Sequence, residues 1–118
     1  MSGLKSYLAG KAAEDAVLAA YRAQGYRLLC RRWRGAGGEI DLVLSKAGEV
    51  VFVEVKSSRS FAQAVAHLTR HQIRRLLASA EAALGFFGAG SLTPMRFDVA
   101  LVDGMGRIDV IPNALQAG

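Results

Sequence analysis

The sequence is poor in the features that cross-link small proteins or carry them into membranes. Its single cysteine, Cys30, excludes a disulfide within the chain and fits a reducing compartment. No stretch approaches the roughly 18 continuous apolar residues of a membrane-spanning helix, and the N-terminus has no apolar run of signal-peptide length. We therefore expect a cytoplasmic protein that makes no use of a membrane.

Internal repeats, linkers and low-complexity segments are also absent, and the composition is that of a globular protein. The 118 residues are 52% hydrophobic and 21% charged, which argues against disorder and suits one domain over residues 1–118. Fifteen Lys and Arg against ten Asp and Glu leave a formal net charge of +5. This excess favours an anionic partner, such as nucleic acid, over an acidic one.

Apolar spacing predicts an α/β domain. Helical periodicity indicates two helices, and alternating or continuous apolar runs indicate five strands; the helices are expected over 4–24 and 62–86, and the strands over 26–34, 39–45, 50–57, 95–102 and 107–111. Three consecutive strands followed by a crossover helix and further strands are typical of a mixed central sheet flanked by helices.

Charged residues interrupt the second and third predicted strands. Side chains alternate between the faces of a strand, so Glu39 and Asp41 share one face, as do Glu54 and Lys56. A two-residue loop at Ala47 and Gly48, or a four-residue loop over 46–49, sets Asp41 opposite Glu54 and Glu39 opposite Lys56. A three-residue loop would place them on opposite faces. The hairpin register therefore tests whether the two carboxylates form a site.

Two opposed carboxylates repel each other and need compensation. Mg²⁺ or Mn²⁺ supplies it, because hard divalent cations bind through one or two carboxylates together with water and phosphate oxygens. Lys56 would lie beside such a metal, and the backbone carbonyl of Val55 could add a ligand. The alternative is the polar face of a half-exposed strand pair, with Glu39 and Lys56 in a weak surface ion pair.

Glu14 is unusual because it falls within the apolar stripe of the first predicted helix. If that helix packs on the same face of the sheet, Glu14 becomes a third carboxylate that converges on the site. A further open point concerns residues 31–34, Arg-Arg-Trp-Arg. They could line a nucleic-acid groove with Trp33 stacked on a base, or Trp33 could belong to the core.

Four stretches in order carry a resemblance to a known family: "GKAAEDAVLAAY" (10–21), "GEIDLV" (38–43), "VFVEVKS" (51–57) and "RFDVALV" (96–102). Together they resemble the YraN-like family of uncharacterised bacterial proteins. That family is similar to the restriction-endonuclease-like PD-(D/E)XK superfamily, in which archaeal Holliday-junction resolvases are near relatives in pattern. The resemblance covers nearly the whole chain and implies an αβββαβ core.

The resemblance also implies roles for individual residues. Asp41 and Glu54 would be the acidic metal ligands, Lys56 the motif lysine, and Glu14 the helix residue that assists metal or water binding. Two positions depart from the pattern around this centre: Ile40 replaces the proline before the motif Asp, and Ser58, followed by Arg59, replaces an arginine. On the second helix, Gln72 stands where a lysine is expected. Asp98 is expected to be structural and to pair with Arg96 or a neighbouring strand.

The basic residues Arg59, Arg70, Arg74 and Arg75 are candidates for contacting a phosphate backbone, although a solvated helix face explains the last three as well. The leading hypothesis is a Mg²⁺- or Mn²⁺-dependent endonuclease or nucleic-acid-processing protein that cleaves phosphodiester bonds, with branched DNA as one candidate substrate. The alternative is a non-catalytic nucleic-acid-binding module on the same fold, and a third is a protein-binding domain with a vestigial acidic centre. Because junction-cutting relatives act as dimers, a homodimer is compatible with the first hypothesis.

Overall fold

The computed structural model describes residues 2–88 and 92–114, with side chains from residue 9 onward, and it confirms the predicted order of helices and strands except for the second predicted helix. The elements in chain order are α1 (Ser2–Ala23), β1 (Arg27–Gly35), β2 (Gly38–Lys46), β3 (Glu49–Ser57), α2 (Phe61–Ala66), α3 (Arg70–Phe87), β4 (Met95–Val102) and β5 (Ile108–Ile111). The protein is a mixed α/β domain, as the sequence pattern indicates.

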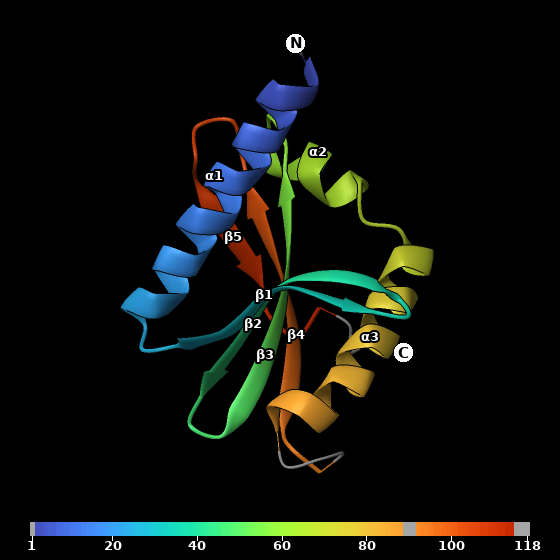
Figure 1. Cartoon of the computed structure of the whole chain (residues 1–118). Helices are drawn as coiled ribbons and strands as arrows, with labels where there is room; N and C mark the ends of the chain where they lie inside the picture. The colour runs from blue at the N-terminus through green and yellow to red at the C-terminus, as the bar shows by residue number, and fades with distance from the viewer. Residues whose placement is uncertain (1, 89–91, 115–118) are drawn as a thin grey trace.

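The five strands form one mixed sheet in the order β1-β2-β3-β4-β5. Only β3 and β4 run parallel to each other, and α2 and α3 make the crossover between them. Figure 1 shows α1 on one face of the sheet and α2 and α3 on the other. The strand that carries Glu54 and Lys56 is therefore central and covered on both faces.

Alternating side chains of β3 fill two separate cores. Val51 and Val53 pack with α1, whereas Val50 and Phe52 pack with α3. Continuing this alternation, Glu54 and Lys56 lie on the face of Phe52, toward α3. The strand thus directs its two charged side chains away from α1.

The helix expected over 62–86 is two helices, and this is a correction to the sequence prediction. The helical conformation is interrupted at residues 67–69, between α2 and α3. Each helix has its own N-cap: the hydroxyl of Ser60 accepts from the N–H of Gln63, and that of Thr69 accepts from the N–H of Gln72, both at 3.1 Å. Two S/T-x-x-Q patterns were visible in the sequence and mark two helix starts.

A two-residue turn joins β2 to β3 and sets the predicted register. Ala47 and Gly48 have φ angles of +52° and +83°, as expected of a tight hairpin turn whose twist matches the strands. The pairing then runs from Lys46↔Glu49 to Leu42↔Val53. The paired residues therefore follow the predicted register up to Leu42↔Val53, one position short of Asp41 and Glu54.

The tip of the β1–β2 hairpin rests on α3 rather than on β3. The Ser79 hydroxyl accepts from the N–H of Gly37 at 2.9 Å and donates to the carbonyl of Gly38 at 3.3 Å. The approach is so close that a Cβ at Gly37 would lie 1.8 Å from the carbonyl oxygen of Arg75. The glycine-rich turn therefore lets the two backbones meet.

Trp33 is partly buried and packs against the core on the α3 side, as the core alternative expects. Its ring lies 4.8 Å from that of Phe86 and 5.2 Å from that of Phe87, and Cys30 packs against the same core. In the described part of the chain, no helix combines the length and apolarity that a membrane crossing would need.

Candidate metal and nucleic-acid site

The candidate site forms where β2 separates from β3. The pairing between these strands ends at Leu42↔Val53, and β2 continues as the partner of β1 alone, through Trp33↔Ile40 and Arg34↔Glu39. At this point the Asp41 carboxylate accepts a hydrogen bond of 2.7 Å from the main-chain N–H of Val55. The Asp41 side chain thus replaces the main-chain acceptor that a continued ladder would have supplied.

Because the strands part here, the predicted approach of Glu39 to Lys56 does not occur. Glu39 pairs instead with Arg34 across the β1–β2 hairpin, at 3.3 Å. The Lys56 ammonium lies 3.2 Å from Glu54 Oε2 on its own strand. The surface ion pair between Glu39 and Lys56, which the alternative interpretation expected, is therefore not formed. Lys56 contacts Glu54 within the candidate site instead.

Glu54 is a buried carboxyl group, only 5% exposed. Its pKa is raised to about 8, and the largest cause is burial, because a desolvated carboxylate loses its hydration. The charge of Asp41 and the contact between the two carboxyl groups also contribute to this rise, and Lys56 acts in the opposite direction. A carboxyl group with this pKa is mostly protonated at neutral pH, so a cation that binds there must displace its proton.

The arrangement leaves one acceptor of Glu54 unused. Its Oε2 meets Lys56 and lies 3.5 Å from the side-chain nitrogen of Gln72, the position where a lysine was expected. Its Oε1 is buried and has no hydrogen-bond partner among the residues that the structure describes. A buried carboxylate oxygen without a partner is costly. The oxygen-rich pair of Asp41 and Glu54 therefore fits a hard divalent cation such as Mg²⁺.

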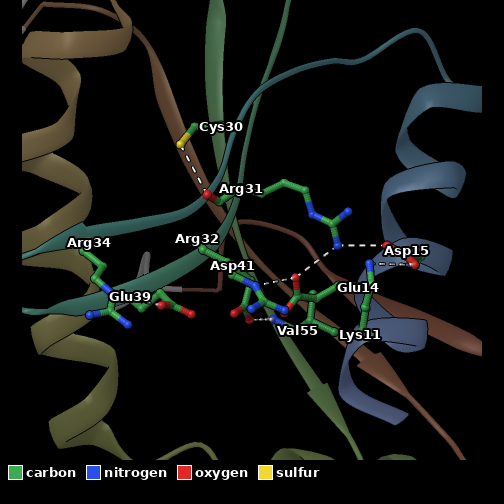
Figure 2. A network of polar contacts seen from close by, with 10 residues as sticks. All are labelled: Lys11, Glu14, Asp15, Cys30, Arg31, Arg32, Arg34, Glu39, Asp41 and Val55. Atoms are coloured by element: carbon green, nitrogen blue, oxygen red, sulfur yellow. Dashed lines mark hydrogen bonds and ion pairs between the residues drawn. The ribbon is translucent and has the colours of Figure 1, made fainter. Parts of the chain in front are cut away.

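Glu14 lies on the other side of the sheet and has different neighbours from those expected. Since α1 covers the face of Val51 and Val53, Glu14 does not share a face with Glu54. Its Oε1 instead lies 3.3 Å from Arg31 Nη2 and 3.7 Å from Arg32 Nε, both on β1 (Figure 2). Glu14 therefore meets two arginines of β1, and its predicted part in metal or water binding stays a prediction.

Glu14 and Asp41 nevertheless line one cleft. It has a volume of about 1010 Å³ and runs between α1, the end of β3 and the turn after β4, bordered also by Val55, Arg59 and Asp103. Within residues 2–88 and 92–114, no three His, Cys, Asp or Glu side chains are grouped closely enough to hold a metal ion.

The predicted basic residues divide into two places. Arg59 is exposed at the border of the cleft. Arg70, Arg74 and Arg75 are exposed on α3, the helix that supplies Gln72 to Glu54. The structure thus brings Arg59 to the cleft and leaves the three helix arginines on the opposite side of the sheet.

Sequence reasoning overlooked Asp103, which shapes the cleft border. Its carboxylate accepts from the N–H groups of Met105 and Arg107 and from the Arg107 side chain, at 2.6 to 2.9 Å. The signal was an Asp before Gly-x-Gly, which is typical of a side chain that caps its own turn. This carboxylate is fully engaged and serves the loop.

Asp98 is structural, as predicted. It is completely buried and accepts hydrogen bonds from Arg96 at 2.8 Å, from the Tyr21 hydroxyl at 2.7 Å and from the N–H of Asn113 at 2.9 Å. Burial, together with the bond to Asp98, raises the pKa of Tyr21 well above its usual value. This network ties α1 to β4 at the end of the sheet away from the cleft.

The fold and the site together define a mixed α/β protein. It carries two adjacent carboxyl groups and a lysine at the point where strands β2 and β3 of its sheet separate. A family model described as "Uncharacterised protein family UPF0102" matches residues 13–102, so the chain belongs to this family. The matched segment contains all four candidate catalytic residues. This confirms the predicted membership of the YraN-like family.

Relatives match over almost their whole length. A UPF0102 protein of Ruegeria pomeroyi is 53% identical over 116 residues, which cover 98% of this chain and 94% of the relative. One from Cereibacter sphaeroides strain ATCC 17029 is 49% identical over 117 residues, covering 99% and 100%. One from Dinoroseobacter shibae is 42% identical over 111 residues, covering 94% and 83%.

Proposed function

We propose that the protein is a Mg²⁺- or Mn²⁺-dependent nuclease that hydrolyses phosphodiester bonds on a restriction-endonuclease-like PD-(D/E)XK core. One observation carries the proposal: the buried Glu54 carboxyl contacts that of Asp41, has an oxygen without a partner, and lies beside Lys56. Such a cluster of charged groups does not stabilise a sheet. Metal-assisted hydrolysis, by contrast, uses both carboxyl groups and the lysine.

Asp41, Glu54 and the backbone carbonyl of Val55 would hold the cation. In a strand, the N–H and C=O of one residue point to the same neighbour. The N–H of Val55 is directed at Asp41, so its carbonyl is directed to the same gap between β2 and β3. When bound there, the metal would acidify a water molecule and neutralise charge on a phosphate group.

Lys56 would act on the reacting groups. Its side chain is 19% exposed, and its ammonium lies 3.2 Å from Glu54 Oε2. From this position it can orient an attacking water molecule and stabilise the negative charge that develops on the phosphate oxygens. Lys56 also favours the ionised form of Glu54, and so prepares that carboxyl group as a ligand.

The substrate we propose is DNA, with branched DNA preferred. The net charge of +5 and the exposed Arg59 at the border of the cleft favour a polyanion. A homodimer with one site in each protomer would cut two strands of a junction. Action on DNA in the cytoplasm agrees with the expectation of a reducing compartment.

Cleavage assays test this proposal. The full chain is incubated with labelled branched, flapped, duplex and single-stranded DNA and with RNA, in Mg²⁺ or Mn²⁺. We expect metal-dependent cleavage of at least one substrate, and its loss in Asp41→Asn, Glu54→Gln and Lys56→Gln. Glu39→Gln is the matched control, because Glu39 is on the same strand as Asp41 and pairs only with exposed Arg34 among the interactions described.

Wild-type protein that cuts none of these substrates, or Asp41→Asn protein that cuts as well as wild type, would contradict the nuclease proposal. Salt-dependent binding of DNA without cleavage in either metal would favour the non-catalytic binding module instead. Absence of both metal binding and nucleic-acid binding would favour a protein-binding domain.

A further inference from the structure

The turn between β4 and β5 carries an exposed apolar side chain at the border of the cleft. Met105 is 82% exposed and lies between Gly104 and Gly106, which both line the cleft. Figure 1 shows this turn beside α1, at the end of the sheet where β3 leads into α2. Single exposed apolar residues are ordinary on protein surfaces, so exposure alone assigns no role. What distinguishes Met105 is its position beside the cleft that Asp41 also lines.

The turn itself does not require a methionine at this position. Its first residue is Asp103, whose carbonyl accepts from the N–H of Gly106 at 3.1 Å. Gly104 and Met105 are thus the central residues of a β-turn, where glycine and short polar residues are favoured. The turn uses only the main-chain N–H of Met105, which donates to the Asp103 carboxylate at 2.9 Å. The chemistry of the turn therefore leaves the apolar side chain unexplained.

The backbone under Met105 is held in place by two sets of hydrogen bonds. The buried carboxylate of Asp103 accepts from the N–H of Met105, and from the N–H and Nε of Arg107 at 2.8 and 2.6 Å. The N–H of Gly104 donates to the carbonyl of Arg59 at 3.1 Å, which joins the turn to the segment after β3. A side chain on an ordered backbone loses less freedom when it binds a ligand. Met105 is thus preorganised for a contact at the cleft.

Exposed cations accompany the methionine at this border. Arg59 lines the cleft, and the Arg107 side chain is 73% exposed while its Nε contacts Asp103. Such cations attract the phosphates of any nucleic acid, whatever its sequence. An apolar side chain has no favourable contact with a phosphate, and in a nucleic acid its partner is the face of a base. The border therefore combines attraction for the backbone with one apolar contact.

Base faces are most accessible where the stack of base pairs is interrupted. Inside a regular duplex, an apolar wedge such as methionine must first unstack a base step, which costs free energy. The cost is lowest where bases are already unpaired or unstacked, as at the branch point of a junction or a flap. A contact between Met105 and a base would therefore favour branched DNA over a continuous duplex.

We propose that Met105 packs on the base faces at the branch point of DNA bound in the cleft, and that it sets the preference for branched over duplex DNA. The inference rests on the proposed function for the nature of the substrate, and it assigns the preference to a residue outside the metal site. The thioether side chain suits this contact, because it is unbranched and polarizable and packs favourably against aromatic rings. Arg59 and Arg107 would bind phosphates of both DNA forms.

Met105→Ala tests the contact. Its binding to a labelled four-way junction and to the matching duplex is measured by fluorescence anisotropy, with the full chain and in EDTA so that no cleavage occurs. We expect about tenfold loss of affinity for the junction, less than about twofold for the duplex, and an unchanged salt slope because no charge is removed. Met105→Leu, which stays apolar, should keep most of the junction affinity. Urea unfolding of Met105→Ala should match wild type, because alanine keeps the N–H that Asp103 accepts.

Two further variants serve as controls. Leu92→Ala removes another exposed apolar side chain, 93% exposed and before the start of β4 rather than after its end, and should bind both DNA forms as wild type does. Arg59→Ala should weaken binding of junction and duplex by a similar factor and reduce the salt slope by about one. A 2-aminopurine base at the branch point gives a direct readout: its fluorescence should change when wild type binds, and Met105→Ala should lose most of that change.

The outcomes separate this inference from the nuclease proposal. If Met105→Ala keeps the wild-type ratio of junction to duplex affinity, the base contact is wrong, even when wild type cuts DNA. If Met105→Ala instead changes the oligomeric state in sedimentation, the side chain serves self-association and the inference is also wrong. If wild type prefers the junction through Met105 but cuts nothing, the nuclease proposal fails while this inference stands. If wild type binds neither DNA form, both proposals are wrong.

Discussion

The carboxylate of Asp41 accepts a 2.7 Å hydrogen bond from the main-chain N–H of Val55, the residue that follows Glu54. The position of one candidate metal ligand is thus set by the backbone of the strand that carries the other. Such a link preorganises the pair, because the Asp41 carboxylate cannot move without breaking its bond to the strand that carries Glu54. It also makes the site a measurable part of the stability of the fold.

Asp41→Asn and Asp41→Ala separate the hydrogen bond from the charge, since both remove the charge and only Asn keeps an acceptor oxygen. We expect Asp41→Ala to be less stable than Asp41→Asn by about 1–3 kcal/mol, because the buried N–H of Val55 loses its acceptor. Urea unfolding at one pH measures the difference. Equal stability of the two variants would show that the bond to Val55 contributes nothing.

Glu54 makes the stability of the protein depend on pH in a direction opposite to that of a salt-bridged carboxylate. Its pKa is about 8 in the folded state against an ordinary value of 4.5. Below pH 4.5 the carboxyl group is protonated in both states and contributes no pH dependence. Between these values only the folded state keeps the proton, so unfolding releases it and stability falls as pH rises, by up to about 1.4 kcal/mol per pH unit.

Glu54→Gln isolates this contribution, because a neutral amide of the same shape does not titrate. The difference in unfolding free energy between wild type and Glu54→Gln should shift in favour of the variant from pH 5 to about pH 8 and then become constant. A difference that does not change over this interval would mean that the folded protein does not hold the Glu54 proton.

Divalent cations should counteract the rise in the pKa of Glu54 that burial causes. A cation bound by the ionised pair stabilises the folded state, by about 2.7 kcal/mol at one hundred times its dissociation constant. Because binding must displace the Glu54 proton, Mn²⁺ should raise Tm more at pH 8 than at pH 6. Glu39→Gln should respond as wild type, and Asp41→Asn and Glu54→Gln should not respond. An equal rise in Tm in all four proteins would point to binding elsewhere.

Gly37→Ala tests the docking of the β1–β2 hairpin on α3. The new Cβ would meet the carbonyl oxygen of Arg75 at 1.8 Å, so the hairpin tip must move and the bond to Ser79 must weaken. We expect a loss of about 1–3 kcal/mol in urea unfolding. Gly85→Ala is the matched control, because its Cβ meets nothing within 4 Å on an exposed turn of α3. That variant should gain about 0.5–1 kcal/mol.

Local patterns predicted the elements well and one boundary badly. The strand that carries Asp98 was predicted at its observed bounds, 95–102, because turn residues delimit its apolar run at both ends. The prediction of one continuous helix over 62–86 was wrong, because the apolar periodicity of the sequence continues across the break at residues 67–69. Two hydroxyl caps, Ser60 and Thr69, were the stronger signal, since a cap satisfies N–H groups that periodicity ignores.

The site was predictable to the extent that it depends on local geometry. The Ala47–Gly48 turn sets the hairpin register, and the alternation of side chains then brings Asp41 toward Glu54 and places Lys56 beside it. The partners of Glu14 were not predictable, because Arg31 and Arg32 reach it only after α1 packs on the sheet and β1 adopts a left-handed residue.

By itself, the sequence determined the order of the elements, the turn between β2 and β3 and the pairing that follows from it, since each depends on residues close together in the chain. Only the tertiary structure decided that β2 leaves β3 at Asp41, that Glu54 is buried with an unpartnered oxygen, and that α1 covers the opposite face. These features arise from contacts between distant segments. Their burial and electrostatics exist only once the sheet and helices have packed.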